Sequence, residues 1–593
     1  MIEQNVPLEH RRKDFTMKQL MLGNQALARG LYEAGCCVVS SYPGTPSTEV
    51  TEEAAKFEEI YCEWAPNEKV AMEVAFGACL AGKRSFCGMK HVGLNVAADP
   101  LYTCSYTGVN AGMIICVADD AGMHSSQNEQ DSRHHAIASK VPMLEPSDSQ
   151  EAYAFAKLAY EISETFDTPV IIKMCTRVAH SQSVVDTAER VVPAVKTYEK
   201  NIAKYVMMPG NAIRRHPFVE ERTRKLAEWS ETSGVNRVEM GDTSLGIITS
   251  STSYQYVKEV FGAKASVLKI GMVNPLPTKM ILDFAAKVDK IAIVEELDPI
   301  IENHCKALGL EVVGKDVFPI EGEYSQNMVA AKLGAEVPCS KKLDENLPVR
   351  PPVMCSGCPH RGLFYTLKQN KVTVLGDIGC YTLGAVAPLS AMDVTLCMGA
   401  SISSIHGFNK ALGTESEGKI VAVIGDSTFM HSGMTGLANI AYNQSNSTVI
   451  ILDNSITGMT GHQQNPTTGY NIKGDPAGKI DLEALCKAMG FNRVRVVDPY
   501  DLAQCDAVLK EELAAEEPSV IISRRPCVLL KYVKPKKPLK VLCDKCVGCK
   551  SCMRLGCPSI SMKDGKACID TTLCVGCGVC KQLCRLGALE SQE

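Results

Sequence analysis

Short apolar runs recur along the chain, separated by segments in which apolar positions follow a helical spacing. In the first block, strand-like runs at 36–40, 113–118 and 169–173 alternate with helical stretches such as Asn67–Ala81. Strands that alternate with helices are typical of a parallel sheet, because parallel neighbours need a long crossover connection. The pattern therefore predicts an α/β domain over residues 1–195.

The same pattern returns twice downstream. A polar segment at 196–240 is predicted to connect the first domain to a second α/β domain over 241–350, which ends in the loop-rich sequence ENLPVRPP. Runs of strand length in the second domain lie at 245–250, 266–270 and 290–295. A third α/β domain is predicted over 351–530. Its strands are short and β-branched, as buried parallel strands are, and read VTVL, VTLCM, KIVAVI, STVIILD and SVIIS.

The C-terminal segment has a different composition. The sequence KYVKPKKPLK, residues 531–540, holds five lysines and two prolines. Proline propagates neither a helix nor a central strand, and like charges keep a chain extended, so 531–541 is predicted to be a linker. Beyond it, 542–593 is a small cysteine-rich domain, because ten of the 27 cysteines lie in the last 53 residues.

Composition and charge exclude several classes of protein. The 593 residues are 45% apolar and 22% charged, which suits several globular domains. The 62 basic and 67 acidic residues give a net charge of −5, without the basic surplus of nucleic-acid binders. There is no apolar run of about eighteen residues to span a membrane, and Met1–Lys18 lacks the apolar core of a secretion signal. A cytoplasmic location is expected, where clustered cysteines more often bind metal than form disulfides.

Eight cysteines of the C-terminal segment form two similar sets, although four residues precede the last cysteine of the first set and three precede that of the second. In each set three thiols two residues apart are followed by a fourth, and in two-cluster proteins that fourth thiol binds the cluster of the other set. Quartet one is then Cys546, Cys549, Cys552 and Cys584. Quartet two is Cys574, Cys577, Cys580 and Cys557. Each would hold one [4Fe–4S] cluster, and the segment resembles a bacterial two-cluster ferredoxin domain. Structural zinc fits poorly, because zinc usually takes ligands in two pairs. Cys543 lies one more step upstream and could compete as a ligand.

Two strand ends of the third block carry oxygen ligands. Gly425-Asp426-Ser427 follows one predicted strand, and 453–456, Asp-Asn-Ser-Ile, follows the next. Open α/β sheets bind ligands at the carboxyl ends of their strands, and a diphosphate there needs a hard cation with oxygen ligands. The pair resembles the GDG…NN motif of the thiamine-diphosphate fold. The resemblance assigns Mg²⁺ to Asp426, Asn454 and the backbone oxygen of Ile456, and brings Gly425 and Ser427 to the cofactor. Ser427 replaces the usual glycine, and Asp453 replaces the first asparagine.

In the first block, the loop YPGTPS at 42–47 follows a strand, and Glu68 opens a helix of small residues. Both resemble the pyrimidine-binding domain of the 2-oxoacid:ferredoxin oxidoreductases. The resemblance implies that Glu68 hydrogen-bonds N1′ of the aminopyrimidine, which activates the cofactor for loss of its C2 proton. It also implies that Thr45 hydrogen-bonds the carboxylate or carbonyl of the substrate. Glu73 is a rival five residues on, but the family's glutamate opens the helix, so Glu68 is favoured.

The same family supplies a hypothesis for a third cluster. Its members ligate a [4Fe–4S] cluster beside the thiamine with a CxGC motif, a GIGC motif and a late cysteine, and this chain has counterparts of all three in order, with GDIGC at 376–380. Gly379 would then contact the cofactor, and His360 would hydrogen-bond the cofactor or the cluster. Quartet three is Cys355, Cys358, Cys380 and Cys527. The remaining thiols, including Cys36, Cys37 and Cys486, are assigned to packing.

The whole chain resembles the large (alpha) subunit of these oxidoreductases, and CPHR after the CxxC motif favours their arylpyruvate branch. The order implied is a pyrimidine-binding domain, a transketolase-C-like domain, a diphosphate-binding domain and a two-[4Fe–4S] ferredoxin domain. The reaction implied converts indolepyruvate, phenylpyruvate or hydroxyphenylpyruvate with coenzyme A to arylacetyl-CoA and CO₂, and reduces an external ferredoxin.

The resemblance also implies partners. A separate small (beta- or gamma-type) subunit of about 200 residues is expected, because the chain has no room for that module. Self-association into a heterotetramer is expected, because thiamine usually lies between pyrimidine and diphosphate domains of different protomers. Alternatives left open are another 2-oxoacid as substrate, a non-oxidative thiamine-dependent decarboxylase, and a pure electron-transfer subunit.

Overall fold

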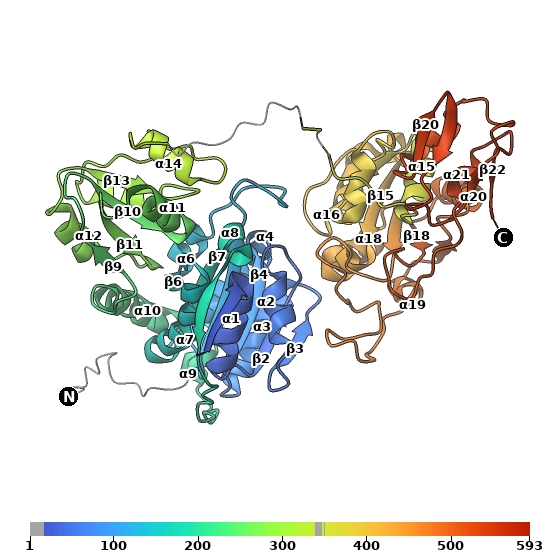
Figure 1. Ribbon diagram of the computed structural model, residues 1–593. Coiled ribbons are helices and arrows are strands. Elements are labelled where there is room, and N and C mark those ends of the chain that lie inside the picture. Colours follow the sequence, from blue (N-terminus) through green and yellow to red (C-terminus); the bar gives the residue numbers. More distant parts are fainter. Residues whose placement is uncertain (1–16, 338–346, 349, 593) are drawn as a thin grey trace. The chain divides into compact units, whose positions relative to one another are not determined.

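The computed structural model describes residues 17–337, 347–348 and 350–592 (Figure 1). It divides the chain into two compact units, Met1–Lys342 and Leu343–Glu593. The segment 1–16, which carries most of the expectation about a secretion signal, lies outside the described residues, as do residues 345, 346 and 349 of the loop ENLPVRPP. None of the helices within the described ranges has the length and apolar character needed to cross a membrane.

A seven-stranded sheet lies at the centre of the first unit, with strand order β12-β6-β7-β5-β4-β2-β3. All its pairs are parallel except that of β12 with β6, which confirms the predicted parallel sheet. The strands are β2 (Val38–Ser41), β3 (Tyr61–Trp64), β4 (Ser85–Lys90), β5 (Met113–Asp119), β6 (Met143–Leu144), β7 (Val170–Cys175) and β12 (Met272–Asn274). Every residue of β4, β5 and β7 is buried, because helices cover both faces of the sheet.

The helices of this unit follow the strands in alternation. They are α1 (Gly23–Glu33), α2 (Thr48–Ala54), α3 (Glu68–Leu80), α4 (His91–Val96), α5 (Ala98–Thr107), α6 (Arg133–Ser139), α7 (Ser149–Phe166) and α8 (Thr176–His180). A two-stranded antiparallel ribbon of β1 (Met17–Leu22) and β8 (Gln182–Thr187) lies beside them. The predicted helix Asn67–Ala81 is α3, and Asn67 caps it by accepting a hydrogen bond from the Val70 N–H at 2.9 Å.

A smaller sheet of order β13-β10-β11-β9 completes the first unit. Its strands are β9 (Arg237–Glu239), β10 (Gly246–Ser250), β11 (Ser266–Ile270) and β13 (Ile291–Val294), with helices α11 (Ser251–Phe261), α12 (Thr278–Ala285), α13 (Ile300–Ala307) and α14 (Gln326–Lys332). The segment 196–240, predicted as a connecting segment with some helix, does contain helices and also contributes a strand to this sheet. It holds α9 (Ile202–Tyr205) and the 22-residue α10 (Pro209–Ser230), and it supplies β9.

The two sheets of this unit share one apolar core. Strand β12 lies within the range predicted for the second domain, yet it extends the first sheet. A single buried cluster contains side chains of α3, β4 and β5 together with side chains of β10, β11 and α12. The two sheets therefore form one folding unit, which the separate apolar patterns along the sequence did not indicate.

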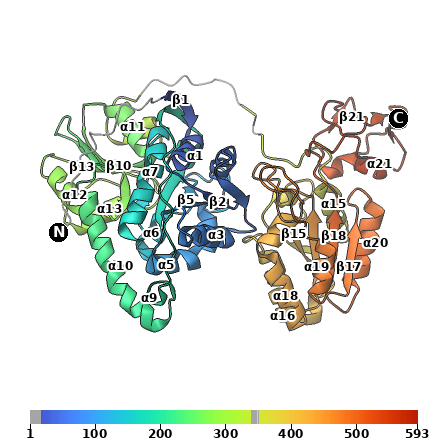
Figure 2. The ribbon, with the colours of Figure 1, turned by 90° about the horizontal axis from the view of Figure 1, so that it is seen from below.

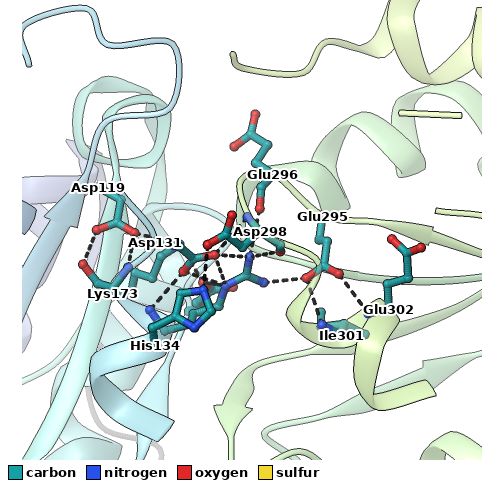
Figure 3. A network of polar contacts seen from close by, with 12 residues as sticks. Asp119, Asp131, His134, Lys173, Glu295, Glu296, Asp298, Ile301 and Glu302 are labelled. Atoms are coloured by element: carbon teal, nitrogen blue, oxygen red, sulfur yellow. Dashed lines mark hydrogen bonds and ion pairs between the residues drawn. The ribbon is translucent and has the colours of Figure 1, made fainter. Parts of the chain in front are cut away.

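A buried network of charged side chains joins the same two sheets (Figure 3). Arg133, 1% exposed, donates to Asp131 and to Glu295, both at 2.6 Å. Its guanidinium also donates to the backbone oxygen of Asp298 at 2.8 Å. Nearby, Lys173 lies 2.7 Å from a carboxylate oxygen of Glu145. Burial raises the pKa of Glu295, and the charge of Arg133 opposes that shift.

Replacing Arg133 by methionine is expected to destabilise the first unit by about 3–5 kcal/mol, because two buried carboxylates lose their cation. The measurement is the unfolding midpoint of purified protein in urea, followed by circular dichroism. The matched control is Arg177→Met, since Arg177 pairs with Glu323 but is 55% exposed; its loss should cost less than about 1 kcal/mol. Equal costs for the two variants would contradict the role of Arg133.

The second unit is built on a five-stranded parallel sheet of order β14-β15-β16-β18-β17 (Figure 2). Its strands are β14 (Thr373–Leu375), β15 (Ile420–Gly425), β16 (Thr448–Asp453), β17 (Arg493–Val497) and β18 (Ser519–Arg524). Side chains of α15 (His360–Asn370) and α20 (Leu502–Leu513) pack on one face, and those of α16 (Ala400–Leu412), α18 (Met434–Asn443) and α19 (Leu482–Ala488) on the other.

One predicted strand of the second unit is wrong. The run VTLCM at 394–398 makes only an isolated bridge between Val394 and Leu375, and Val394 and Leu396 are 52% and 68% exposed. The backbone turns here into α16 instead, because the buried Asp377 carboxylate accepts hydrogen bonds from the N–H groups of Gly399 and Ser401, each at 3.1 Å.

The C-terminal segment packs on the second unit as a small lobe. It contains β19 (Lys540–Val541) paired with β22 (Leu589–Glu590), β20 (Ile560–Lys563) paired with β21 (Lys566–Ile569), a 3₁₀ turn at Ser551–Leu555 and α21 (Val579–Gln582). Its apolar cluster includes Tyr365, Tyr500 and Leu502 of the main sheet domain. Within the predicted linker 531–541, residues 531–539 form no helix or strand, whereas Lys540–Val541 form β19.

Candidate active site

The carboxyl edge of the seven-stranded sheet gathers the residues predicted for the first block. Strand β2 lies between β3 and β4 and runs parallel to both. The loop with Thr45 follows β2, α3 with Glu68 follows β3, and Lys90 ends β4. Because carboxyl ends of parallel neighbours meet at one edge, these three residues belong to one region of the unit.

Glu68 is buried, with 5% of its surface exposed at the first turn of α3. Its carboxylate rests against the backbone of α4: a Cβ added to Gly93 would lie 2.5 Å from Glu68 Oε1. Glu73, the rival, instead forms an ion pair with Lys69, and its side chain is 47% exposed. A buried carboxylate at a strand end is the better candidate for activating a cofactor, so the geometry favours Glu68.

The Thr45 loop is held by hydrogen bonds of its own. Ser47 donates through both its N–H and its hydroxyl to the Gly44 oxygen, at 2.9 and 2.8 Å. The Asn24 side chain donates to the Pro46 oxygen at 2.7 Å. These contacts fix the backbone on both sides of Thr45, which is itself half-buried.

Lys90 is a member of this edge that the sequence did not single out. It is 8% exposed, and its Nζ donates to the Ser125 backbone oxygen at 2.7 Å and to the Ser125 hydroxyl at 3.3 Å. Burial lowers the pKa of Lys90 to about 8, and the charge of Asp120 opposes that shift. Gly44 lies directly against it, since a Cβ added to Gly44 would be 2.9 Å from the Lys90 Cβ.

The second unit places the predicted magnesium ligands at adjacent strand ends. Asp426 follows β15 and Asn454 follows β16, and these strands pair in parallel. Asp426 is 2% exposed and Asn454 is 7% exposed. Asp426 accepts hydrogen bonds from the Ser427 N–H at 2.9 Å and from the Thr467 hydroxyl at 3.3 Å. The Asn454 side-chain oxygen accepts one from the Ile456 N–H at 3.3 Å.

These residues fit a metal-bound diphosphate. Burial raises the pKa of Asp426 to about 7, and the charge of Asp453 adds to the shift. Among the described side chains no lysine or arginine lies within the 4.0 Å ion-pair distance of Asp426. A buried carboxylate without a cation is costly, and a divalent ion with oxygen ligands removes that cost. His360 also lies at this edge, 3.3 Å from the Asn454 amide nitrogen, and burial lowers its pKa to about 4.

The four thiols of quartet three lie near one another in this unit. Burial raises the pKa of Cys380 to about 11, and the charges of Cys527 and Cys355 add to the shift. Burial likewise raises the pKa of Cys358 to about 12, where Cys355 and Cys380 contribute. The Cys527 N–H donates to the Asn454 oxygen at 2.9 Å. Quartet three thus adjoins the predicted diphosphate site, although its members span more than two thirds of the unit's sequence.

Quartet one lines a single cavity of the C-terminal lobe. All four of its thiols are among the lining residues, whereas the exposed Cys543 is not. Backbone N–H groups point at two of them, from Ala567 to Cys546 Sγ at 3.4 Å and from Ala588 to Cys584 Sγ at 3.2 Å. Such donors stabilise thiolates and tune cluster potentials.

Quartet two also converges. Burial raises the pKa of Cys580, and the charges of Cys577, Cys557 and Cys574 add to the shift. The same thiol is affected by Cys552 of quartet one, so the two quartets are neighbours. The thiols are close enough to affect one another's pKa, but no three His, Cys, Asp or Glu side chains within the described ranges are grouped closely enough to hold a single metal ion.

The C-terminal lobe is attached where quartets two and three approach each other. The Arg361 guanidinium donates to the Leu555 oxygen of the lobe at 2.6 Å and to the Met354 oxygen at 2.6 Å. Tyr500 donates through its hydroxyl to the Gly357 oxygen. Gly357 leaves room for the lobe, because a Cβ there would lie 2.2 Å from the Val575 side chain.

Comparisons with known proteins address the same segments. Residues 29–237, which hold Thr45 and Glu68, match the family described as "Pyruvate flavodoxin/ferredoxin oxidoreductase, thiamine diP-bdg". Residues 377–523, which hold Asp426 and Asn454, match "Thiamine pyrophosphate enzyme, C-terminal TPP binding domain". Both α/β regions therefore match thiamine-diphosphate-binding domains.

Several curated relatives match nearly the whole chain. The chain is 39% identical to the indolepyruvate oxidoreductase subunit IorA of Archaeoglobus fulgidus, over 96% of both sequences. It is 40% identical to the IorA subunit of Pyrococcus horikoshii, over 97% of both. The 2-oxoglutarate synthase subunit KorA of Archaeoglobus fulgidus is 21% identical over 51% of this chain and 99% of its own length.

Proposed function

Because the chain belongs to the family of indolepyruvate oxidoreductase IorA subunits, which are thiamine-diphosphate-dependent oxidoreductases, we propose that it oxidatively decarboxylates arylpyruvates. The reaction joins one arylpyruvate and coenzyme A, and yields arylacetyl-CoA, CO₂ and a proton. The two electrons released pass singly to two molecules of ferredoxin. Indolepyruvate, phenylpyruvate and hydroxyphenylpyruvate are the proposed substrates.

One observation supports this proposal above the others: quartet three adjoins the strand ends with Asp426 and Asn454. Bound thiamine diphosphate supplies an electron sink at the 2-oxo carbon, and [4Fe–4S] clusters supply one-electron acceptors. A non-oxidative decarboxylase needs the electron sink but has no use for the one-electron acceptors. Their proximity on one unit therefore favours oxidation over simple decarboxylation.

The chain's own residues have distinct tasks in this proposal. Asp426, Asn454 and the Ile456 backbone oxygen would hold Mg²⁺ and through it the diphosphate, with Gly425, Ser427 and Gly379 at the cofactor. Glu68 would share a proton with N1′ of the aminopyrimidine ring. The Thr45 hydroxyl would donate a hydrogen bond to the substrate, oriented by the fixed loop around it. Quartets one, two and three would hold the three clusters.

Partners complete the enzyme. We propose a separate small subunit of about 200 residues, a heterotetramer with two copies of this chain, and an external ferredoxin as acceptor. The test is ferredoxin reduction by phenylpyruvate with the purified complex. Reduction that requires both coenzyme A and thiamine diphosphate supports the proposal. Aldehyde and CO₂ without reduced ferredoxin would point to a non-oxidative decarboxylase instead.

The iron content separates two clusters from three. Anaerobically purified protein is expected to contain about twelve irons per chain, and a Cys380→Ser variant about eight, because quartet three then loses a ligand. The measurement is colorimetric iron analysis with electron paramagnetic resonance of the reduced protein. Cys505→Ser is the matched control, since this buried thiol belongs to no quartet and should leave twelve. About eight irons in the unmodified protein would reject the third cluster.

A further inference from the structure

Three strand ends define the substrate side of the first unit. Strand β2 lies between β3 and β4, so its loop with Thr45 is flanked by Glu68 after β3 and by Lys90 at the end of β4. Gly44 touches Lys90 directly, with 2.9 Å between a Cβ built on the glycine and the Lys90 Cβ. The backbone and Cβ of Lys90 therefore lie against the loop that carries Thr45, the residue proposed to bind substrate.

Lys90 is buried without a carboxylate partner. Among the described residues, no carboxylate oxygen lies within the 4.0 Å ion-pair distance of its Nζ. An ammonium group has three donors, and the described contacts occupy two, both with Ser125. Buried lysines are normally paired, so the third donor of Lys90, for which no partner is described, is available to an acidic group of a ligand.

The nearest acid is already engaged. Asp120 accepts hydrogen bonds from the Ser125 N–H at 2.9 Å, the Ser126 hydroxyl at 2.5 Å and the Thr176 hydroxyl at 2.8 Å. These bonds use both of its carboxylate oxygens and hold the loop that supports Lys90. Asp120 thus shapes the position of the ammonium group without pairing with it.

We propose that Lys90 binds the carboxylate of the 2-oxoacid substrate and selects acids over uncharged carbonyl compounds. The inference rests on the proposed function, because it takes a 2-oxoacid as the substrate. A carboxylate at Lys90 would gain a charge-assisted hydrogen bond, while the neighbouring Thr45 hydroxyl binds the same end of the molecule. The aryl group, which carries no charge, would then extend away from this pair.

The test compares ligands that differ only in charge. Phenylacetate and phenylacetamide have the same shape, and their binding to the thiamine-diphosphate-loaded complex is measured by calorimetry. The unmodified enzyme should prefer the carboxylate by about 10- to 100-fold, the strength of one charged hydrogen bond. Lys90→Met should bind the two ligands within about threefold of each other, and Lys90→Arg should restore part of the preference.

The control is Lys69→Met, because Lys69 is a lysine of α3 that pairs with Glu73 on the exposed side; it should keep the full preference. If Lys90→Met still prefers phenylacetate to phenylacetamide, the inference is overturned. It is also overturned if Lys90→Met raises the KM for coenzyme A but leaves the ratio of the two ligand affinities unchanged. An unmodified enzyme without preference would overturn it too. Failure of the proposed function appears separately, as an unmodified complex that reduces no ferredoxin with any 2-oxoacid.

Discussion

A Glu68→Gln enzyme is expected to reduce ferredoxin with phenylpyruvate about 10²- to 10⁴-fold more slowly than the unmodified enzyme, the usual range for loss of a positioned acid–base group. Glutamine keeps the size of the side chain that rests on Gly93, so packing should survive. It cannot share a proton with the pyrimidine nitrogen. The rate is measured anaerobically with saturating coenzyme A and added thiamine diphosphate.

Two further measurements make this result specific. Iron content and the reduction of the clusters by dithionite should be unchanged in Glu68→Gln, because every cysteine of the three quartets belongs to the second unit whereas Glu68 belongs to the first. Glu73→Gln should retain nearly full activity, since Glu73 pairs with Lys69 at the surface. If Glu73→Gln is the inactive variant, Glu73 and not Glu68 is the glutamate that activates the cofactor. If both variants are active, the chain is an electron-transfer subunit.

Asp426→Ala is expected to weaken the binding of thiamine diphosphate by at least about 100-fold, because even residues that merely support a metal ligand cost 10- to 100-fold when lost. Asp426 is the buried carboxylate at the end of β15, and no described cation neutralises it. The affinity is measured by equilibrium dialysis at fixed Mg²⁺ concentration. The lost affinity should return only slightly when Mg²⁺ is raised.

Asp453→Asn is the matched control for this site. Asp453 ends β16 one residue before Asn454, and its carboxylate pairs with Arg524 at 2.9 Å on a partly exposed surface. It replaces the first asparagine of the motif, so asparagine there restores the more usual residue. We expect thiamine diphosphate to bind this variant within about threefold of the unmodified protein, since exposed ion pairs contribute little. A loss as large as that of Asp426→Ala would assign the metal to Asp453.

The sequence predicted the ends of β15 and β16 in the second unit well, because their physical signals are local. A buried parallel strand is apolar throughout, so the run before Gly425 and the run before Asp453 mark β15 and β16. The first polar residues after such runs fall at the carboxyl edge. Asp426 and Asn454 could therefore be placed together before their separation in space was known.

Other features depend on tertiary structure and had no local signal. The run VTLCM has the composition of a strand, yet the hydrogen bonds of Asp377 turn its backbone into α16. Strand β17 alternates Arg493 and Arg495 with valines, as an edge strand does, and the arginines pair with acids of α20. Lys90 is the last residue of the apolar strand β4 and belongs to no recognised motif. Its significance comes from burial without a carboxylate partner.

The grouping of cysteines shows the same contrast. Quartets one and two follow from spacing, because each repeats three thiols at fixed steps. Quartet three combines Cys355, Cys380 and Cys527 from three separate segments, and only the resemblance to a known family indicated it. Their approach in the structure depends on β14 to β18 forming one sheet.

The C-terminal lobe packs directly on the sheet domain of the second unit and is held there by hydrogen bonds and side-chain contacts. Arg361 binds the Leu555 oxygen, Gln582 donates to the Tyr500 oxygen at 2.6 Å, and Gly357 admits the Val575 side chain. Electrons crossing from one side to the other would travel between stationary carriers. Solvent viscosity would then slow only the arrival and departure of the diffusing acceptor protein. The rate of electron transfer between the clusters would be the same in a viscous solvent as in water.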